Sequence, residues 1–346
     1  MKPIDRRSII AAAFASAGWN AAAQTRTERD IAAKNSAPIS PKDNLKITKL
    51  ETFLVKPRWL FLKVHTNAGI VGLGETYYTP RSVSTYIEEV LAPQLLNADP
   101  LQIEQFWRRA YDGSHVYGNK GLETRCLSAV DIALWDILGQ HAGQPVWQML
   151  GGNSHPDGVL VYNTCASAGY AQGTPGVARK NAPVLAQQYR DYEAWHEDAG
   201  KLAKSLLDMG ITGMKIWPFD QFGTSLGGPI GSRAGAEAVG PVTHFLSKDD
   251  MKKGLSYVED IRKTVGDQME IAIEGHARWN LPEAIEIGRA LEKYDILWLE
   301  EIIPPDNADS YARLKAAVKV PICVSERLFT RFGFRQIIEK NAADII

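Results

Sequence analysis

Hydrophobic and polar positions follow two different periods in the first half of the chain. Three short apolar runs, separated by a proline and by a turn signal, are typical of an antiparallel β-meander. These runs cover residues 47–55, 60–64 and 70–74. Residues 122–142 instead carry apolar side chains on one helical stripe, and Gly143 follows as a stop signal. The pattern therefore predicts an α+β domain over residues 46–157.

Beyond residue 158, strand-like runs alternate with helical patterns. The expected strands cover residues 159–164, 213–217, 270–274, 296–300, 321–325 and 343–346. The expected helices cover residues 192–209, 249–265, 281–294, 307–318 and 330–341. This alternation indicates a parallel sheet with right-handed crossovers, either doubly wound or a (β/α) barrel, over residues 158–346. The glycine-rich phosphate-binding motifs of doubly wound folds are missing, which favours the barrel.

The first residues have the layout of an export signal. Arg6 and Arg7 precede a short apolar stretch, and Ala21–Ala23 offer a small-residue cleavage site. This layout over residues 1–23 is typical of a twin-arginine signal peptide and predicts a periplasmic or exported protein. The alternative is an ordinary amphipathic start of a cytoplasmic protein. The polar residues 24–45 that follow are expected to be a linker.

Composition excludes several classes of protein. The chain has 39 basic and 40 acidic residues, and its net charge of -1 makes binding to nucleic acid an unfavourable hypothesis. No apolar run reaches the roughly 20 residues that a membrane-spanning helix needs. The three cysteines, Cys126, Cys165 and Cys323, are too widely spaced for a disulfide framework or a zinc site. We expect them to be small buried hydrophobic residues.

Three acidic residues, Glu274, Glu300 and Glu326, follow apolar runs at a regular interval. In a barrel the carboxyl ends of the strands converge on one mouth, so we expect the three side chains to meet there. Neighbouring carboxylates raise one another's pKa, so they either become protonated or surround a divalent cation. An all-oxygen ligand set favours Mg²⁺ over Zn²⁺. The alternative is that these residues are solvated strand ends with unrelated loops.

Several stretches of the chain resemble the enolase superfamily, in its mandelate racemase/muconate lactonizing enzyme branch. The most telling are Ala133–Ile137, Met214–Trp217, Trp298–Glu301 and Ser325–Arg327. Further stretches are similar to acid-sugar dehydratases of the D-galactonate dehydratase type: Pro57–Trp59, Gly275–Arg278, and Glu326–Arg327 followed by Arg331 and Phe332. The resemblance implies an α+β capping domain followed by a modified (β/α) TIM-type barrel.

The resemblance also implies roles for individual residues. Glu274, Glu300 and Glu326 correspond to the Mg²⁺ ligands. His276 corresponds to the histidine that donates a proton to the leaving 3-hydroxyl, the alternative being a loop histidine that only packs or forms hydrogen bonds. Lys215 is expected to contribute charge for the substrate carboxylate, or to form a simple salt bridge.

Four more residues are candidates for the same site. Trp59, Arg278 and Arg327 are expected to bind the substrate. Glu301 is expected to lie behind the metal ligands or, alternatively, at the surface. The substrate itself is expected to be a small acid sugar, and the full-length protein a homo-oligomer.

The reaction that the resemblance implies is dehydration of an aldonate or aldarate to a 2-keto-3-deoxy acid. It begins with abstraction of the proton beside the carboxylate, and the resulting enediolate charge is stabilised by Mg²⁺. Trp217 stands where racemases of this superfamily place a second lysine, which weighs against a two-lysine racemase. The alternatives are a racemase, epimerase or cycloisomerase, and an inactive remnant that binds sugar acids.

Two features depart from the family pattern. The family usually has Asp where this chain has Glu274, and the extra methylene is expected to shift the cation or change its coordination. The chain also ends at Ile346, before the positions where relatives place an Asp–His pair as the proton-abstracting base and their eighth strand. We therefore expect a C-terminally truncated barrel without full activity.

Overall fold

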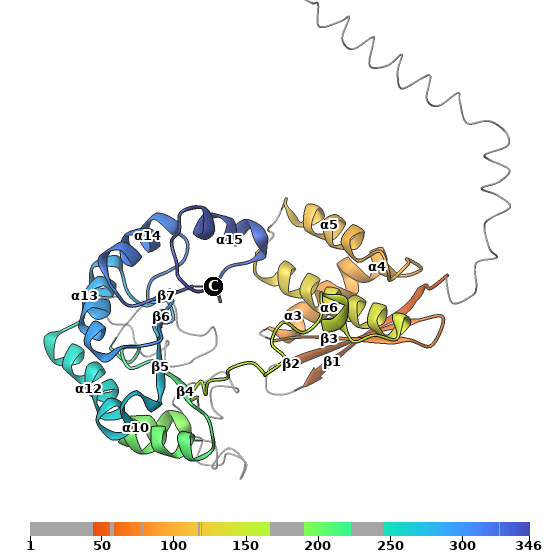
Figure 1. The fold of residues 1–346 in the computed structure, drawn as a ribbon. Coiled ribbons are helices and arrows are strands. Elements are labelled where there is room, and N and C mark those ends of the chain that lie inside the picture. Colours follow the sequence, from red (N-terminus) through yellow and green to blue (C-terminus); the bar gives the residue numbers. More distant parts are fainter. Residues whose placement is uncertain are drawn as a thin grey trace, which may run out of the picture.

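The computed structural model describes residues 44–55, 59–77, 79–116, 118, 120–166, 190–222, 245–324 and 326–346. The predicted signal peptide and almost all of the predicted linker lie outside these residues. The described chain forms two lobes, joined by an extended segment that follows residue 150 (Figure 1). No helix among these residues has the length and apolar character needed to cross a membrane.

The first lobe contains the predicted meander. Strands β1 (Ile47–Val55), β2 (Trp59–Thr66) and β3 (Val71–Tyr77) form an antiparallel sheet in the order β1-β2-β3. One face of the sheet is buried because apolar residues alternate along the central strand β2. The long helix α6 (Leu122–Ala142) packs on this face and ends at Gly143 in the left-handed conformation, as predicted.

Shorter helices complete the first lobe. They are α3 (Pro80–Tyr86), the π-helix η2 (Ile87–Leu91), α4 (Ala92–Leu95), α5 (Ile103–Ser114) and α7 (Val146–Met149). Two glycines in β3 allow the sheet to approach α6 very closely. A Cβ atom on Gly74 would lie 2.0 Å from the backbone oxygen of Ala129, so only glycine fits there.

The second lobe is a parallel sheet with helices on its outer side (Figure 1). Its strands, in spatial order, are β4 (Gly213–Ile216), β5 (Glu270–Glu274), β6 (Trp298–Glu300) and β7 (Ile322–Cys323). Its helices are α10 (Asp191–Asp208), α12 (Lys248–Val265), α13 (Leu281–Leu291), α14 (Ala308–Ala317) and α15 (Thr330–Glu339), with short 3₁₀ turns η3 (Gly266–Gln268) and η4 (Glu292–Tyr294). Within residues 191–339 the predicted alternation of strands and helices is confirmed.

The two outermost predicted strands are wrong. Residues 159–164 and 343–346 contribute only isolated bridges, from Asn163 to Met214 and from Ile345 to Cys323. Val159, Leu160 and Val161 are 74%, 95% and 68% exposed. An apolar run becomes a strand only where several successive residues pair with a neighbouring strand, and in the described residues each of these segments pairs at one position only.

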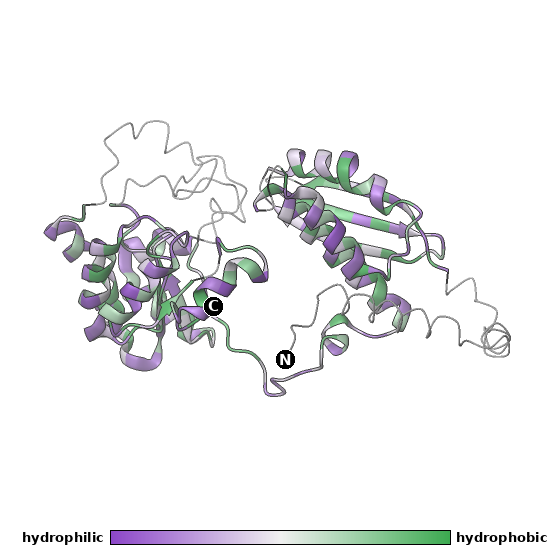
Figure 2. Ribbon diagram, turned by 90° about the horizontal axis from the view of Figure 1, so that it is seen from above, coloured by the Kyte–Doolittle hydropathy of each residue, from purple (hydrophilic) through white to green (hydrophobic). Residues whose placement is uncertain are grey.

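Each lobe has its own hydrophobic core, and no buried residue belongs to both cores. In Figure 2 the ribbon of most helices alternates between hydrophobic and hydrophilic residues, as expected of helices with one face on a core. The lobes touch where α15 begins. There Phe332 stacks on Tyr111 of α5 with ring centroids 5.5 Å apart, and Arg125 of α6 lies 5.9 Å from the Phe329 ring.

Candidate active site

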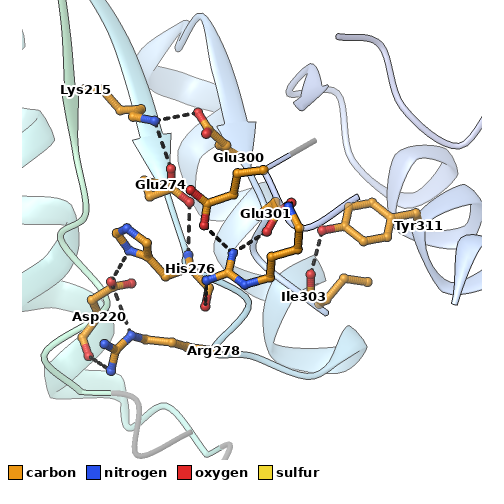
Figure 3. A network of polar contacts seen from close by, with 11 residues as sticks. Lys215, Asp220, Glu274, His276, Arg278, Glu300, Glu301, Ile303 and Tyr311 are labelled. Carbon is orange, nitrogen blue, oxygen red and sulfur yellow. Dashed lines mark hydrogen bonds and ion pairs between the residues drawn. The ribbon is translucent and has the colours of Figure 1, made fainter. Parts of the chain in front are cut away.

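The centre of the candidate site is a buried lysine between two buried glutamates at the carboxyl ends of β4, β5 and β6. Glu274 and Glu300 are partners in the parallel register, so their side chains leave the sheet at the same height. Lys215 Nζ lies 2.9 Å from an oxygen of each carboxylate, and Figure 3 shows it between them. Trp298 Nε1 donates to Glu300 at 3.0 Å, and the backbone N–H of His276 donates to Glu274 at 3.1 Å.

Charge and burial compete within this cluster. Burial raises the pKa of Glu274 to about 8, although His276 and Lys215 favour its charged form. Burial acts in the same direction on Glu300, but there the Lys215 ammonium outweighs it and lowers the pKa. Burial alone would lower the pKa of Lys215, but the two carboxylates outweigh that effect and raise it. Lys215 is therefore the positive partner of both carboxylates. The salt bridge that was the alternative interpretation of Lys215 is present in the structure.

Glu326 does not join this cluster. The regular interval in the sequence predicts equal height on three strands, but Glu300 lies opposite Cys323 and not opposite Glu326. Glu326 therefore follows β7 in a turn, where its side chain is 43% exposed and lies 2.6 Å from Arg327. The expectation of equal height holds for the first two acids and is wrong for the third.

His276 stands beside Glu274 on a strained turn. Both His276 and Ala277 adopt the left-handed backbone region, with φ of 43° and 56°, which is uncommon for residues other than glycine. The turn directs the imidazole toward Asp220, which accepts a hydrogen bond from Nδ1 at 2.5 Å (Figure 3). Burial would lower the pKa of His276, but Asp220 and Glu274 outweigh it and raise the pKa to about 9. His276 is thus held in a fixed position beside Glu274, and its predicted role as a proton donor stays a prediction.

A second buried ion pair lies behind this turn. Glu301 is fully buried and ion-pairs with Arg327, which rules out the surface alternative for Glu301. Arg327 also donates to the carbonyl of His276 at 3.2 Å and contacts Glu326. In this structure Arg327 joins the turns after β5, β6 and β7, and its predicted contact with substrate stays a prediction.

The other two predicted substrate-binding residues lie in different places. Arg278 donates to the backbone carbonyl of Asp220 at 3.3 Å and is close to its carboxylate, so it belongs to the His276 surroundings. Trp59 lies in the other lobe at the start of β2, with its ring 5.6 Å from that of Tyr77. Their binding roles stay predictions.

Sequence reasoning missed Asp220 and Trp298. Asp220 directly follows the apolar residues that extend β4, which is the pattern that singled out Glu274 and Glu300 on their strands. The same signal could therefore have identified it. Trp298 lies two residues before Glu300 on the same strand, and side chains at this spacing share a face. Its indole donor was overlooked because tryptophans are ordinary core residues.

The donor set suits a hard divalent cation, although the described residues bring no three His, Cys, Asp or Glu side chains close enough to hold one. Glu274 and Glu300 present carboxylate oxygens toward one point, which is the ligand chemistry that Mg²⁺ prefers. The ammonium of Lys215 at this point shows that the space between the oxygens favours positive charge.

Comparisons with known proteins identify the family to which this architecture belongs. Residues 47–151 match the mandelate racemase / muconate lactonizing enzyme N-terminal domain, and residues 198–346 match the enolase C-terminal domain-like family. A solved enolase of the mandelate racemase subgroup from Agrobacterium tumefaciens is similar at a TM-score of 0.69 and 36% identity, over 87% of this chain and 69% of that one. An α+β cap and a sheet of β/α units with acidic residues at its strand ends define an enolase-like protein.

Two curated relatives narrow the class. A D-mannonate dehydratase from Novosphingobium aromaticivorans is 30% identical over 87% of this chain and 70% of its own length. A D-galactonate dehydratase from Ralstonia nicotianae is 30% identical over 87% of this chain and 67% of its own length. The chain belongs to the mandelate racemase/muconate lactonizing enzyme family of the enolase superfamily.

Proposed function

We propose that this protein is a Mg²⁺-dependent dehydratase that converts an acid sugar into a 2-keto-3-deoxy acid. The observation that carries the proposal is the buried group at the strand ends, in which two register-matched carboxylates lie beside a histidine that is held by Asp220. The dehydratases of mannonate and galactonate among the relatives support the same class of substrate.

Glu274 and Glu300 would hold the cation, and Glu326, which lies in the turn after β7, is its proposed third ligand. When bound, Mg²⁺ supplies Lewis-acid stabilisation of the negative charge that develops on the substrate carboxylate. Lys215 adds a fixed positive charge beside the two carboxylates, where it attracts and orients the carboxylate of the substrate. Burial of Lys215, Glu274 and Glu300 excludes water and strengthens the interactions among them.

His276 would supply the proton that dehydration requires. The hydrogen bond to Asp220 uses Nδ1, so Nε2 is the nitrogen left to face the substrate. A proton held at Nε2 can pass to the 3-hydroxyl as its bond to carbon breaks, so that the group leaves as water. Arg278 and Arg327 hold the neighbouring turns in place through Asp220 and the His276 carbonyl.

The structure gives an observation against the racemase alternative. Trp217 stands at the position of the second lysine, is almost fully buried, and packs edge-on against the His276 ring at 5.4 Å. An indole cannot accept a proton as an amine can. A base at this position is therefore missing, and dehydration with His276 as proton donor is favoured.

The experiment is a screen of aldonic and aldaric acids in the presence of Mg²⁺, with 2-keto-3-deoxy acids detected as their semicarbazones. We expect at least one acid to yield the keto acid, and His276→Asn to lower that rate by about 10²–10⁴-fold. Exchange of the C2 proton with solvent and no keto acid would instead indicate a racemase or epimerase. Binding of an acid in calorimetry without either reaction would indicate a binding protein.

We also propose that the protein is exported through its twin-arginine-type leader and assembles into a homo-oligomer. Fractionation of cells that express the full chain and an Arg6→Lys/Arg7→Lys variant tests export, because the variant should remain in the cytoplasm. Sedimentation velocity tests the assembly.

A further inference from the structure

Asp220 makes the closest contact with the side chain of His276. Its Oδ2 accepts the hydrogen bond from Nδ1 at 2.5 Å, and the two side chains are only 9% and 11% exposed. Figure 3 shows the carboxylate of Asp220 beside the imidazole, on a segment that comes from a different strand. The two residues therefore meet through the fold and not through local sequence.

The backbone holds both partners firmly. Asp220 follows β4 in a turn whose preceding residue, Phe219, is fully buried against α12. A Cβ atom on Gly254 would lie 2.3 Å from the Phe219 ring, so this packing has no spare room. His276 follows the neighbouring strand β5, which is in parallel register with β4. The segments that follow β4 and β5 therefore start side by side, and packing fixes their positions.

Other groups complete the surroundings of the imidazole. Trp217 contacts one side of the ring, and Arg278 donates to the carbonyl of Asp220 at 3.3 Å. The Arg278 Nε atom lies 3.3 Å from Oδ2 of Asp220, the same oxygen that His276 uses. Asp220 is therefore fixed from one side and fixes His276 on the other.

The two carboxylate oxygens of Asp220 differ in their contacts. Oδ1 is buried without a hydrogen-bond partner. Burying an unpaired carboxylate oxygen costs free energy, and buried polar atoms in native proteins are seldom left so. The contacts of this carboxylate are instead concentrated on Oδ2, which faces both His276 and Arg278.

We propose that Asp220 is a positioning residue for His276: by accepting the Nδ1 hydrogen bond it fixes the ring orientation and directs Nε2 toward the substrate. The inference rests on the proposed function, in which His276 donates the proton. Carboxylates that accept from one imidazole nitrogen commonly orient the other nitrogen in this way.

The contact is tested by nuclear magnetic resonance of protein carrying ¹⁵N-labelled histidine, with His276→Gln used for assignment. We expect a downfield Nδ1–H resonance in the wild type, an upfield shift in Asp220→Asn and loss of the signal in Asp220→Ala. The matched control is Asp191→Asn, since Asp191 accepts from Asn163 and has no contact with His276 in the structure. An unchanged His276 resonance in Asp220→Ala overturns the proposal.

The role is tested with whichever acid the screen identifies. Asp220→Ala should lower kcat by about 10²-fold with little change in KM, and should add nothing in a His276→Gln background. The 3-deoxy-3-fluoro analogue loses fluoride without needing a proton, so Asp220→Ala should lower its rate by much less than the roughly 10²-fold expected of a lost proton donor. The role is overturned if Asp220→Ala lowers the rates with the hydroxy acid and with the fluoro analogue equally. It is also overturned if the effects of Asp220→Ala and His276→Gln on kcat are additive. If no acid is bound or converted, the proposed function is wrong. The His276 resonance would still show whether Asp220 accepts the hydrogen bond from Nδ1.

Discussion

At the scale of single residues, Lys215 is the most consequential side chain that the structure describes. It is buried and is the counter-ion of both Glu274 and Glu300. Removing one partner of a buried ionic group leaves uncompensated charge in a region of low dielectric constant. We therefore expect the lysine to stabilise the fold as well as to serve the chemistry that we propose.

We predict that Lys215→Met lowers the free energy of unfolding by about 3–5 kcal/mol, because two carboxylates then share a buried space without a cation. Denaturation in urea measures this. The control is Lys204→Met, which breaks an exposed pair with Asp208 and should cost less than about 1 kcal/mol. Added Mg²⁺ should restore more stability to Lys215→Met than to the wild type, and equal losses in the two variants would contradict the prediction.

The sequence identified the two acids that the structure brings together, and it misplaced the third for a physical reason. Interval along the chain fixes height only when each unit has the same number of residues between registered positions. Glu274 and Glu300 satisfy this condition because they lie opposite each other. The residue opposite Glu300 on β7 is Cys323, and Glu326 comes later in the chain. An apolar run also precedes Asp220 and marks it as a candidate, but its contact with His276 depends on two loops whose geometry no periodicity reveals.

At the scale of elements, the glycines of β3 determine how closely the first lobe packs. We predict that Gly74→Ala lowers the free energy of unfolding by about 1–3 kcal/mol, because the new methyl overlaps the α6 backbone. The control is Gly113→Ala in α5, where a Cβ meets nothing within 4 Å. That variant should gain up to about 1 kcal/mol from helix propensity. Calorimetry measures the free energy of unfolding of both variants. A change of the same sign in both would contradict the prediction that close packing on α6 requires Gly74.

Helices were predicted better than strands. The helix over residues 122–142 was predicted with its observed ends, because a long amphipathic stripe and a glycine stop are local signals. The segments at residues 159–164 and 343–346 carry the right residues for strands but form only single bridges. Pairing is a property of neighbours, so a local pattern cannot decide it.

At the scale of the whole molecule, the lobes have separate cores and touch through aromatic residues. Arg331 lies 5.2 Å from the Trp107 ring, and Phe332 stacks on Tyr111. Contacts of this kind are each worth about 0.5–1.5 kcal/mol beyond the area that they bury. The placement of the first lobe therefore depends on a small number of side chains.

We predict that Phe332→Ala weakens this contact and increases hydrogen exchange in α5 and at the start of α15, while β5 and β6 keep their protection. Mass spectrometry of the exchanged protein measures it. Ile338→Ala, an exposed apolar residue on the same helix, is the control and should leave α5 unchanged. Equal exchange of α5 in the two variants would show that the stack does not hold the lobes together.

The contact between lobes has a consequence for ligand affinity. The turn that carries Glu326 runs directly into Phe329, which packs against Arg125 of the first lobe. We expect restraint of this turn and docking of the lobes to be coupled, and such a coupling free energy acts equally in both directions. A mutation at Phe329 or Arg125 should then alter the apparent dissociation constant of the proposed cation.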